Sequence, residues 1–364
     1  GADAGLDPGA PSDGRAPPAA AEAQPRRIAG RLGSKNRTPA PYPIRGGYRT
    51  ERARFTPAPP VFMMAAPMLE DATLIVGTDL SQVSQPALEA AASLARRFGA
   101  ARVVVVHGLK EGGALAGLDD AQARAAEKAG SAIEAVTPDV GGARIERVVR
   151  AGAPAKVLVE VARERSARLI VVASHGFGAL RRAVLGSVAN ATVRAAPCPV
   201  LVVGSNRPGQ HRLEGVTAAV DLSPISDRVV KAALAVAATD RAPVRLISVL
   251  EAPSRPIGED PASAATLPEA GVERVRTEQA GRLDALAASA PAEAPVKTAL
   301  LEGAIPAEAI LRDLGRTAAS LLVVGASGDD AWNRLVLGST AERLVAEAPC
   351  PVLVIPAEAA AAEG

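Results

Sequence analysis

The feature that most constrains this chain is a spacing pattern that occurs twice. Each copy has a Gly-Ser pair, a Pro-Cys-Pro that begins ten residues after the serine, and then an apolar run; the pairs are Gly186-Ser187 and Gly338-Ser339. The two copies lie about 150 residues apart and share the same internal spacing. A repeat of this length indicates a duplicated domain, and a Gly-Ser pair that opens a helix is typical of anion-binding turns.

The composition predicts aliphatic cores in two domains. The chain has 364 residues, of which 2% are aromatic, and this length is enough for two domains of ordinary size. The net charge is +2, with ten basic and five acidic residues in 1–69 and with 31 basic and 34 acidic residues in 70–364. Because the larger part is slightly acidic, nothing in it predicts nucleic-acid binding.

Residues 1–70 differ from the rest of the chain. They are rich in Ala, Pro, Gly and Arg without hydrophobic periodicity, so we expect a disordered tail, and likewise for 357–364. The basic residues of the first tail leave open a nucleic-acid tail, a transit peptide, or an appendage without function upstream of the natural start. Methionines just before the first strand favour the third interpretation. The basic residues of the Arg-rich middle of this tail are Arg26, Arg27, Arg31, Lys35, Arg37, Arg45, Arg49, Arg52 and Arg54, and the methionines are Met63, Met64 and Met68.

Hydropathy and cysteine usage predict the compartment. No apolar run approaches the ~18–20 residues that span a bilayer, and the N-terminus has no apolar segment typical of a secretory signal. We therefore expect a cytoplasmic chain without membrane insertion. Its two cysteines, Cys198 and Cys350, each lie between two prolines before an apolar strand, and we expect both to be buried, reduced thiols.

Apolar runs alternate with helical patterns through both copies. The expected strands are 73–79, 102–107, 143–150, 168–173 and 200–203, then 215–220, 243–249, 295–301, 320–325 and 351–355. The expected helices are 84–97, 119–136, 153–165 and one from Ser187, then 225–239, 269–289, 305–317 and 339–347. This order predicts an α/β chain with two doubly wound, five-stranded parallel-sheet domains, at 71–204 and 215–356, joined by a linker at 205–214.

In such a sheet the ligand lies beyond the carboxyl ends of the first and fourth strands, where the winding reverses. An aspartate ends the first strand in each copy: Asp79 in Thr-Asp-Leu-Ser and Asp221 in Val-Asp-Leu-Ser. A carboxylate there either accepts hydrogen bonds from the hydroxyls of a ribose or caps the following helix, and the sequence leaves both roles open.

A glycine-bearing loop follows the fourth strand. The second copy reads Gly325-Ala-Ser-Gly328, and the first reads Ala173-Ser-His-Gly176, each followed after nine residues by the Gly-Ser pair. Glycines let the backbone approach phosphate oxygens, and the helix that begins at the serine adds a hydroxyl, amide groups and the positive end of its dipole. Both loops are therefore candidate phosphate sites.

These residues resemble the universal stress protein family over about 70–356, as a tandem member with two family domains. The family's ATP-binding signature, Gly-x2-Gly-x9-Gly-(Ser/Thr), is matched fully in the second copy by Gly325, Gly328, Gly338 and Ser339. The resemblance implies a Rossmann-like fold similar to the adenine nucleotide alpha hydrolases, and an internal pseudo-dimer whose last strands pair. It also implies ATP as the ligand, held by the strand-one aspartates and by the backbone near Gly108 in the first copy and Val249 in the second.

Both copies depart from the signature or its surroundings. In the first, Gly176, Gly186 and Ser187 match, but Ala173 replaces the first glycine and brings a Cβ near the expected ribose. Arg181 and Arg182 in the same loop are candidates to hold phosphate. In the second, Asp329 and Asp330 directly follow Gly328 and would repel a triphosphate unless Mg²⁺ lay between them or the side chains pointed to solvent.

Other candidate functional residues indicate less about what the protein does. His107, His175 and His211 are the chain's three histidines, and no cysteine or second histidine stands at metal-ligand spacing, so we expect no metal site. His107 fits a satisfied sheet-end residue and His175 a solvated or capping one. For Trp332, the sequence leaves open whether the side chain stacks on a base or packs against the protein. No Gly-x-Ser-x-Gly elbow and no Walker A lysine motif is present, and no catalytic residue is assigned.

The family resemblance implies an ATP-binding protein of stress response or regulation. Nucleotide occupancy would change the conformation of the loops at 174–186 and 326–338 and so the binding of an unknown regulatory protein. Two rivals stay open: a slow ATP hydrolase, for which no positioned general base is found, and a nucleotide-free scaffold with degenerate loops. A homodimer of tandem chains is also left open.

Overall fold

The computed structural model describes residues 69–109, 119–175, 185–204, 212–251, 269–291, 295–317, 319–326 and 337–357. The predictions for the N-terminal tail, for most of the linker and of the C-terminal tail, and for several loop residues lie outside this part of the chain. Those loop residues are Gly176, Arg181, Arg182, His211, Gly328, Asp329, Asp330 and Trp332.

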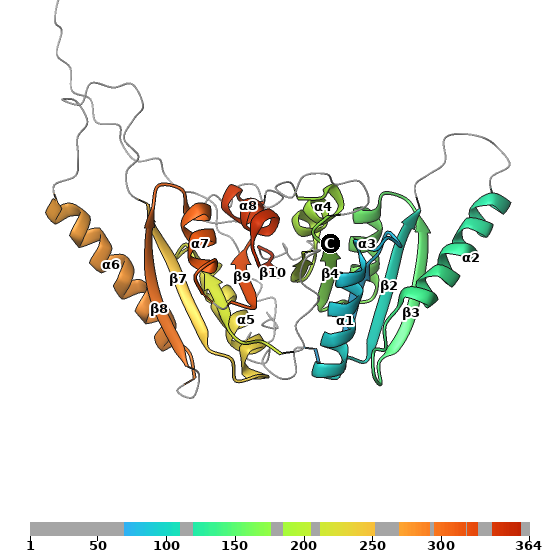
Figure 1. Ribbon diagram of the computed structural model, residues 1–364, viewed down its shortest axis with the longest axis horizontal. Helices are drawn as coiled ribbons and strands as arrows, with labels where there is room; N and C mark the ends of the chain where they lie inside the picture. The colour runs from blue at the N-terminus through green and yellow to red at the C-terminus, as the bar shows by residue number, and fades with distance from the viewer. Residues whose placement is uncertain are drawn as a thin grey trace, which may run out of the picture. The chain divides into compact units, whose positions relative to one another are not determined.

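Strands and helices alternate as expected, and the same order is repeated in two halves (Figure 1). The first half contains β1 (Thr73–Gly77), α1 (Gln85–Phe98), β2 (Arg102–Leu109), α2 (Asp119–Val136), β3 (Arg144–Ala151), α3 (Pro154–Glu164), β4 (Leu169–Ala173), α4 (Ser187–Ala195) and β5 (Val200–Val203). The second half contains β6 (Val216–Ala219), α5 (Ser226–Ala238), β7 (Val244–Glu251), α6 (Glu269–Ala288), β8 (Val296–Gly303), α7 (Pro306–Leu314), β9 (Leu321–Gly325), α8 (Ser339–Glu347) and β10 (Val352–Ile355).

All ten of these strands form one sheet in the order β3-β2-β1-β4-β5-β10-β9-β6-β7-β8. Pairing within each half is parallel, and the winding reverses between β1 and β4 and again between β6 and β9. The last strands of the halves, β5 and β10, pair antiparallel with Leu201 opposite Leu353. The halves therefore form the doubly wound domains and the internal pseudo-dimer that the sequence predicts.

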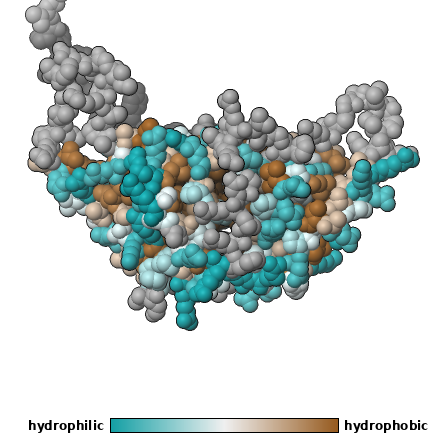
Figure 2. Space-filling view, in the orientation of Figure 1, coloured by the Kyte–Doolittle hydropathy of each residue, from teal (hydrophilic) through white to brown (hydrophobic). Residues whose placement is uncertain are grey.

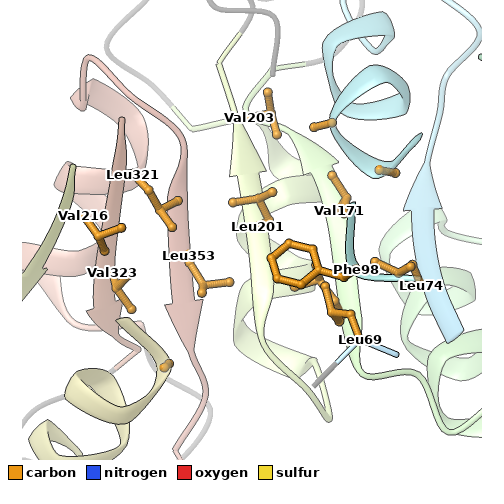
Figure 3. Packing of buried hydrophobic residues seen from close by; sticks show 14 of the residues in the cluster. Leu69, Leu74, Phe98, Val171, Leu201, Val203, Val216, Leu321, Val323 and Leu353 are labelled. Carbon is orange, nitrogen blue, oxygen red and sulfur yellow. The ribbon is translucent and has the colours of Figure 1, made fainter. Parts of the chain in front are cut away.

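The side chains of the strands alternate between two apolar layers. Leu74 and Val76 of β1 face a layer covered by α1, α2, α5 and α6, whereas Ile75 faces a layer covered by α3, α4, α7 and α8. Both layers run across the β5–β10 junction, where Leu201 and Leu353 contribute to the first (Figure 3). The two halves thus share one continuous core on each face of the sheet.

Helix boundaries follow local chemistry. Proline stands within the first two positions of α1, α3 and α7, where its missing N–H costs no helical hydrogen bond. Gly99 ends α1 with φ of 65°, a left-handed conformation that favours glycine, and its N–H donates to the carbonyl of Ala95. The prolines thus mark where these helices begin, and Gly99 marks where α1 ends.

Polar contacts join the halves on both faces of the sheet. On the α1 and α5 face, Arg97 forms an ion pair with Asp240. On the opposite face, the side-chain amide of Asn190 in α4 donates to Glu342 in α8 over 2.9 Å, and Arg194 lies 3.8 Å from the same carboxylate.

Figure 2 shows hydrophilic side chains spread over much of the molecule in that view. No helix among the described residues is long and apolar enough to cross a membrane.

Candidate functional site

A cavity of about 590 Å³ opens at the carboxyl ends of β1, β2 and β4 in the first half. The N-terminal ends of α3 and α4 complete its described wall. All five described site residues predicted in the first half line it: Asp79, Gly108, Ala173, Gly186 and Ser187. Residues that are more than a hundred positions apart in the sequence therefore meet at the reversal point of the sheet, where an open α/β sheet binds its ligand.

The aspartate after β1 closes a turn. Oδ1 of Asp79 accepts hydrogen bonds from the amide of Ser81 over 3.0 Å and from its hydroxyl over 2.6 Å. Asp221 makes the same two contacts with Ser223, over 3.0 and 2.5 Å. The N-cap residues of α1 and α5 are Ser84 and Ile225, so neither aspartate is the helix N-cap that the sequence left open.

Two hydroxyl residues that sequence reasoning missed also line the cavity. Thr78 Oγ1 accepts a hydrogen bond from the amide of Leu80 over 3.0 Å and lies 2.9 Å from Ser84 Oγ. Ser84 is 3% exposed, and its hydroxyl donates to the carbonyl of Ser81 over 2.9 Å. The only signal in the sequence was that Thr-Asp in the first copy becomes Val-Asp in the second.

The loop between β4 and α4 is closed at its base. The amide of Gly186 donates to the carbonyl of Ser174 over 2.8 Å, and in the second half Gly338 donates to Ala326 over the same distance. Gly186 is the N-cap of α4 and supplies no side-chain acceptor to the first-turn amides, while Ser187 lines the cavity. The positive end of α4 therefore lies at the cavity wall, where it favours an anionic group.

Gly108 allows a close approach between strand and helix. A Cβ at this position would lie 2.7 Å from the Cα of Pro154, the first residue of α3. The two histidines of the wall are engaged through Nδ1: His107 with the carbonyl of Thr78, and His175 with Ser174 Oγ, each over 2.9 Å. His107 is thus a satisfied sheet-end residue, as expected. No group of metal-ligating side chains occurs among the described residues.

The departure at Ala173 has a packing explanation. Ala173 packs against the core layer on the α1 side, whereas the cavity's apolar wall, formed by Leu158 and Val172, belongs to the other layer. In the second half, a Cβ on Gly325 would lie 3.0 Å from Cγ2 of Ile225. A side chain at this position is therefore crowded where its neighbour is the larger isoleucine, whereas the alanine of the first half packs on the helix side of its strand.

The cysteines lie in the core. Cys198 and Cys350 are 7% and 6% exposed, and neither forms a disulfide. Burial raises the pKa of the Cys198 thiol to about 12, so it stays protonated and unreactive near neutral pH. This agrees with the expectation of two buried, reduced thiols.

The chain is similar to universal stress proteins in both sequence and fold. A universal stress protein of Thermus aquaticus is 48% identical over 61 residues, 17% of this chain and 44% of the relative. One of Mycolicibacterium smegmatis is 28% identical over 234 residues, 64% of this chain and 75% of the relative. The chain thus spans less than half the length of the first relative. The crystal structure of a universal stress protein from Archaeoglobus fulgidus matches with a TM-score of 0.54 at 21% identity, over 79% of this chain and 97% of that one. This last likeness concerns the fold.

The model of the universal stress protein family matches the chain twice, over residues 72–204 and 214–356. Each match contains one half of the sheet, with one strand-one aspartate and one Gly-Ser helix start. The chain therefore belongs to the universal stress protein family, as a member with two tandem domains.

Proposed function

We propose that this protein binds ATP in the cavity of its first half and acts in stress response or regulation through nucleotide-dependent conformation. The observation that carries the proposal is the convergence of Asp79, Gly108, Gly186 and Ser187 on one cavity at the reversal point of the sheet. Its volume of about 590 Å³ falls within the range of small-molecule sites, roughly 300–1,000 Å³.

Each wall element suits one part of a nucleotide. The carboxylate of Asp79 accepts hydrogen bonds from the ribose hydroxyls, and the backbone beside Gly108 contacts adenine. Amides of Gly186 and Ser187, with the serine hydroxyl and the dipole of α4, hold phosphate oxygens. These roles come from the family resemblance and from the chemistry of each group.

The second half offers an equivalent but different site. Asp221 follows β6, Val249 lies in β7, Gly325 ends β9, and Gly338-Ser339 begin α8. We propose that this half also takes ATP, with Mg²⁺ offsetting the charge of the neighbouring acidic loop residues.

We propose binding rather than turnover. The Nδ1 atoms of His107 and His175 are both hydrogen-bonded within the protein, and Asp79 Oδ1 holds the turn after β1. Each of these three atoms is therefore engaged with a group of the protein itself. Occupancy instead changes the loop between β4 and α4, and a regulatory protein partner that contacts this loop would sense the nucleotide.

A titration of the full chain with ATP tests the site. We expect Gly186→Val to weaken binding at the first-half site at least tenfold, because a side chain at the N-cap blocks the approach of phosphate to the α4 amides. Gly338→Val makes the same change in the second half and tests the site proposed there. Unchanged binding in both variants would refute the sites, and phosphate release by the wild-type chain would favour the hydrolase.

A further inference from the structure

One side-chain nitrogen at the cavity of the first half is buried without a partner. His175 lines this cavity, and its Nε2 is closed off from solvent and forms no hydrogen bond with the protein. It is therefore not the solvated group expected from the sequence. A buried donor or acceptor that stays unpaired destabilises the folded chain, so such groups are rare in native proteins and call for a physical reason.

The orientation of this imidazole is set by Ser174. The amide of Ser174 donates to the carbonyl of Val203, and its carbonyl accepts from the amide of Gly186, each over 2.8 Å. The hydroxyl of Ser174 lies 2.9 Å from Nδ1 of His175. The imidazole is thereby tied, through its neighbour, to the end of β5 and to the N-terminus of α4, which is the part of the wall that favours an anion.

The same contact fixes the position of the proton on the imidazole. Ser174 is 4% exposed, so its hydroxyl must donate inside the protein, and Nδ1 of His175 is the acceptor that the described residues offer it. In a neutral imidazole, an Nδ1 that accepts leaves the proton on Nε2. Nε2 is therefore a donor, and the partner that it lacks is an acceptor.

We propose that Nε2–H of His175 donates to a phosphate oxygen of the nucleotide in the first half, beside the N-terminus of α4. This inference rests on the proposed ATP binding. A phosphate oxygen supplies the acceptor that Nε2 lacks, and a hydrogen bond to a charged acceptor is roughly twice as strong as one between neutral groups. The cost of burying an unpaired donor in the empty site is then recovered when nucleotide binds.

The second half shows that the turn itself does not need this pair. Ala326 stands where the first half has Ser174, and Ser327 stands where it has His175. The backbone contact is kept, since Gly338 donates to the carbonyl of Ala326 over 2.8 Å. The hydroxyl and the imidazole are thus additions of the first half to a backbone contact that both halves share.

A comparison of ATP with adenosine tests the role of His175, because adenosine has no phosphate. All proteins are full-length and carry Gly338→Val, which blocks the second-half site. His175→Asn keeps an acceptor near the position of Nδ1 but removes the donor at Nε2, and we expect it to weaken ATP about tenfold and adenosine by less than about twofold. His175→Gln, whose amide reaches the position of Nε2, should restore ATP binding to within about threefold of the parent protein.

Equal weakening of ATP and adenosine in His175→Asn would indicate a structural role, such as holding a water, and would overturn the inference. An unchanged ATP affinity would overturn it as well. A parent protein that binds neither ligand would instead refute the proposed function, and the inference with it.

A transplant into the second half makes the test independent of the folding of these variants. Ala326→Ser together with Ser327→His, in a chain that carries Gly186→Val, should raise the preference of the second half for ATP over adenosine about threefold or more. If His175→Asn does not fold, the absence of this gain overturns the inference.

Discussion

The two halves share a topology, but equivalent positions near the ends of their strands hold different residues. At the end of the second strand, the first half has Gly108 in contact with Pro154, whereas the second half has Val249 packed against its core layer. After the fourth strand, Ala173 in one half corresponds to Gly325 in the other. A duplicated fold thus preserves the positions of its elements more strictly than the side chains that fill them.

The comparison also teaches how to interpret a glycine motif. Gly325 matches the family signature, yet a Cβ there would meet the side chain of Ile225 at 3.0 Å. Val83, which like Ile225 follows the strand-one aspartate by four residues, is one carbon smaller, and its half has Ala173. A signature glycine can therefore be required by packing as well as by a phosphate.

The largest expected effect follows from Gly108. Gly108→Ala places a Cβ 2.7 Å from the Cα of Pro154, so β2 or α3 must move, and we expect a loss of roughly 2–3 kcal/mol in the free energy of unfolding. Urea denaturation measures it. Gly142→Ala is the control, because nothing lies within 4 Å of a Cβ there and its effect should stay within about 0.5 kcal/mol. Equal losses in both variants would contradict the close contact.

The polar contacts at the junction between the halves join different residues of each half, so the junction is not symmetric. Arg97 is in the first half and its partner Asp240 in the second, and their side chains are only 14% and 11% exposed. Asp240 also accepts the amide of Leu213, and the Arg97 guanidinium lies 5.3 Å from the centre of the Phe98 ring. On the other face, Asn190 of the first half meets a carboxylate of the second.

Asp240→Ala should therefore cost about 2 kcal/mol in the free energy of unfolding, because it leaves the largely buried Arg97 without its counter-ion. Hydrogen exchange at β5 and β10 should accelerate in the same variant, since this junction holds those strands together. Asp227→Ala is the control, as its pair with Lys231 is 47% and 36% exposed and contributes little. Unchanged exchange at β5 and β10 would show that the strand pairing does not depend on this ion pair.

A smaller effect is expected from Gly325→Ala, about 1 kcal/mol, because the added Cβ would lie 3.0 Å from Cγ2 and 3.2 Å from Cδ1 of Ile225, and this side chain must shift. Ile225→Val keeps the γ carbons but removes Cδ1, which would lie 3.2 Å from the added Cβ, and it recreates the valine and alanine combination of the first half. In a double-mutant cycle the two changes should cost less together than the sum of their separate costs. Strict additivity would mean that the two positions do not compete for the same space.

The pattern of the chain was sufficient for the architecture. The repeat and the alternation of apolar runs predicted the parallel order within each half, because each apolar strand must be covered by helices on both faces. The convergence of Asp79 and Gly186 also followed, since the carboxyl ends of parallel strands share one edge, whereas Gly108 was implied by the family resemblance. The family resemblance added the expected pairing of the last strands, and β5 and β10 do pair.

Details that depend on packing distance escaped prediction. No spacing rule shows that Thr78 and Ser84 lie 2.9 Å apart, or that Gly108 is needed for the approach of Pro154. The aspartate after β1 holds a turn and not a helix N-cap, because the turn takes up residues before α1 begins at Gln85. Such facts arise from the exact path of a few residues between two fixed elements.

The smallest expected difference between the halves concerns acid stability. The hydrogen bonds from Arg165 to Glu146, the shorter over 2.7 Å, lower the pKa of that carboxyl below 4.5, against the opposing effect of its partial burial. The second half has Lys297 at the equivalent position of its strand and no such carboxylate. The pair therefore contributes stability only to the first half.

A depressed folded-state pKa contributes stability above the unfolded pKa, and this is lost as the pH falls through the folded value. Glu146→Gln should cost roughly 0.5 kcal/mol at pH 7, and its difference from the wild type should shrink below about pH 4.5. Thermal melts from pH 7 to pH 3 measure this. Lys297→Gln, the matched change in the second half, should give a difference that does not vary over the same range. A Glu146→Gln difference that persisted at pH 3 would mean that packing, rather than the charge of Glu146, supplies the stability.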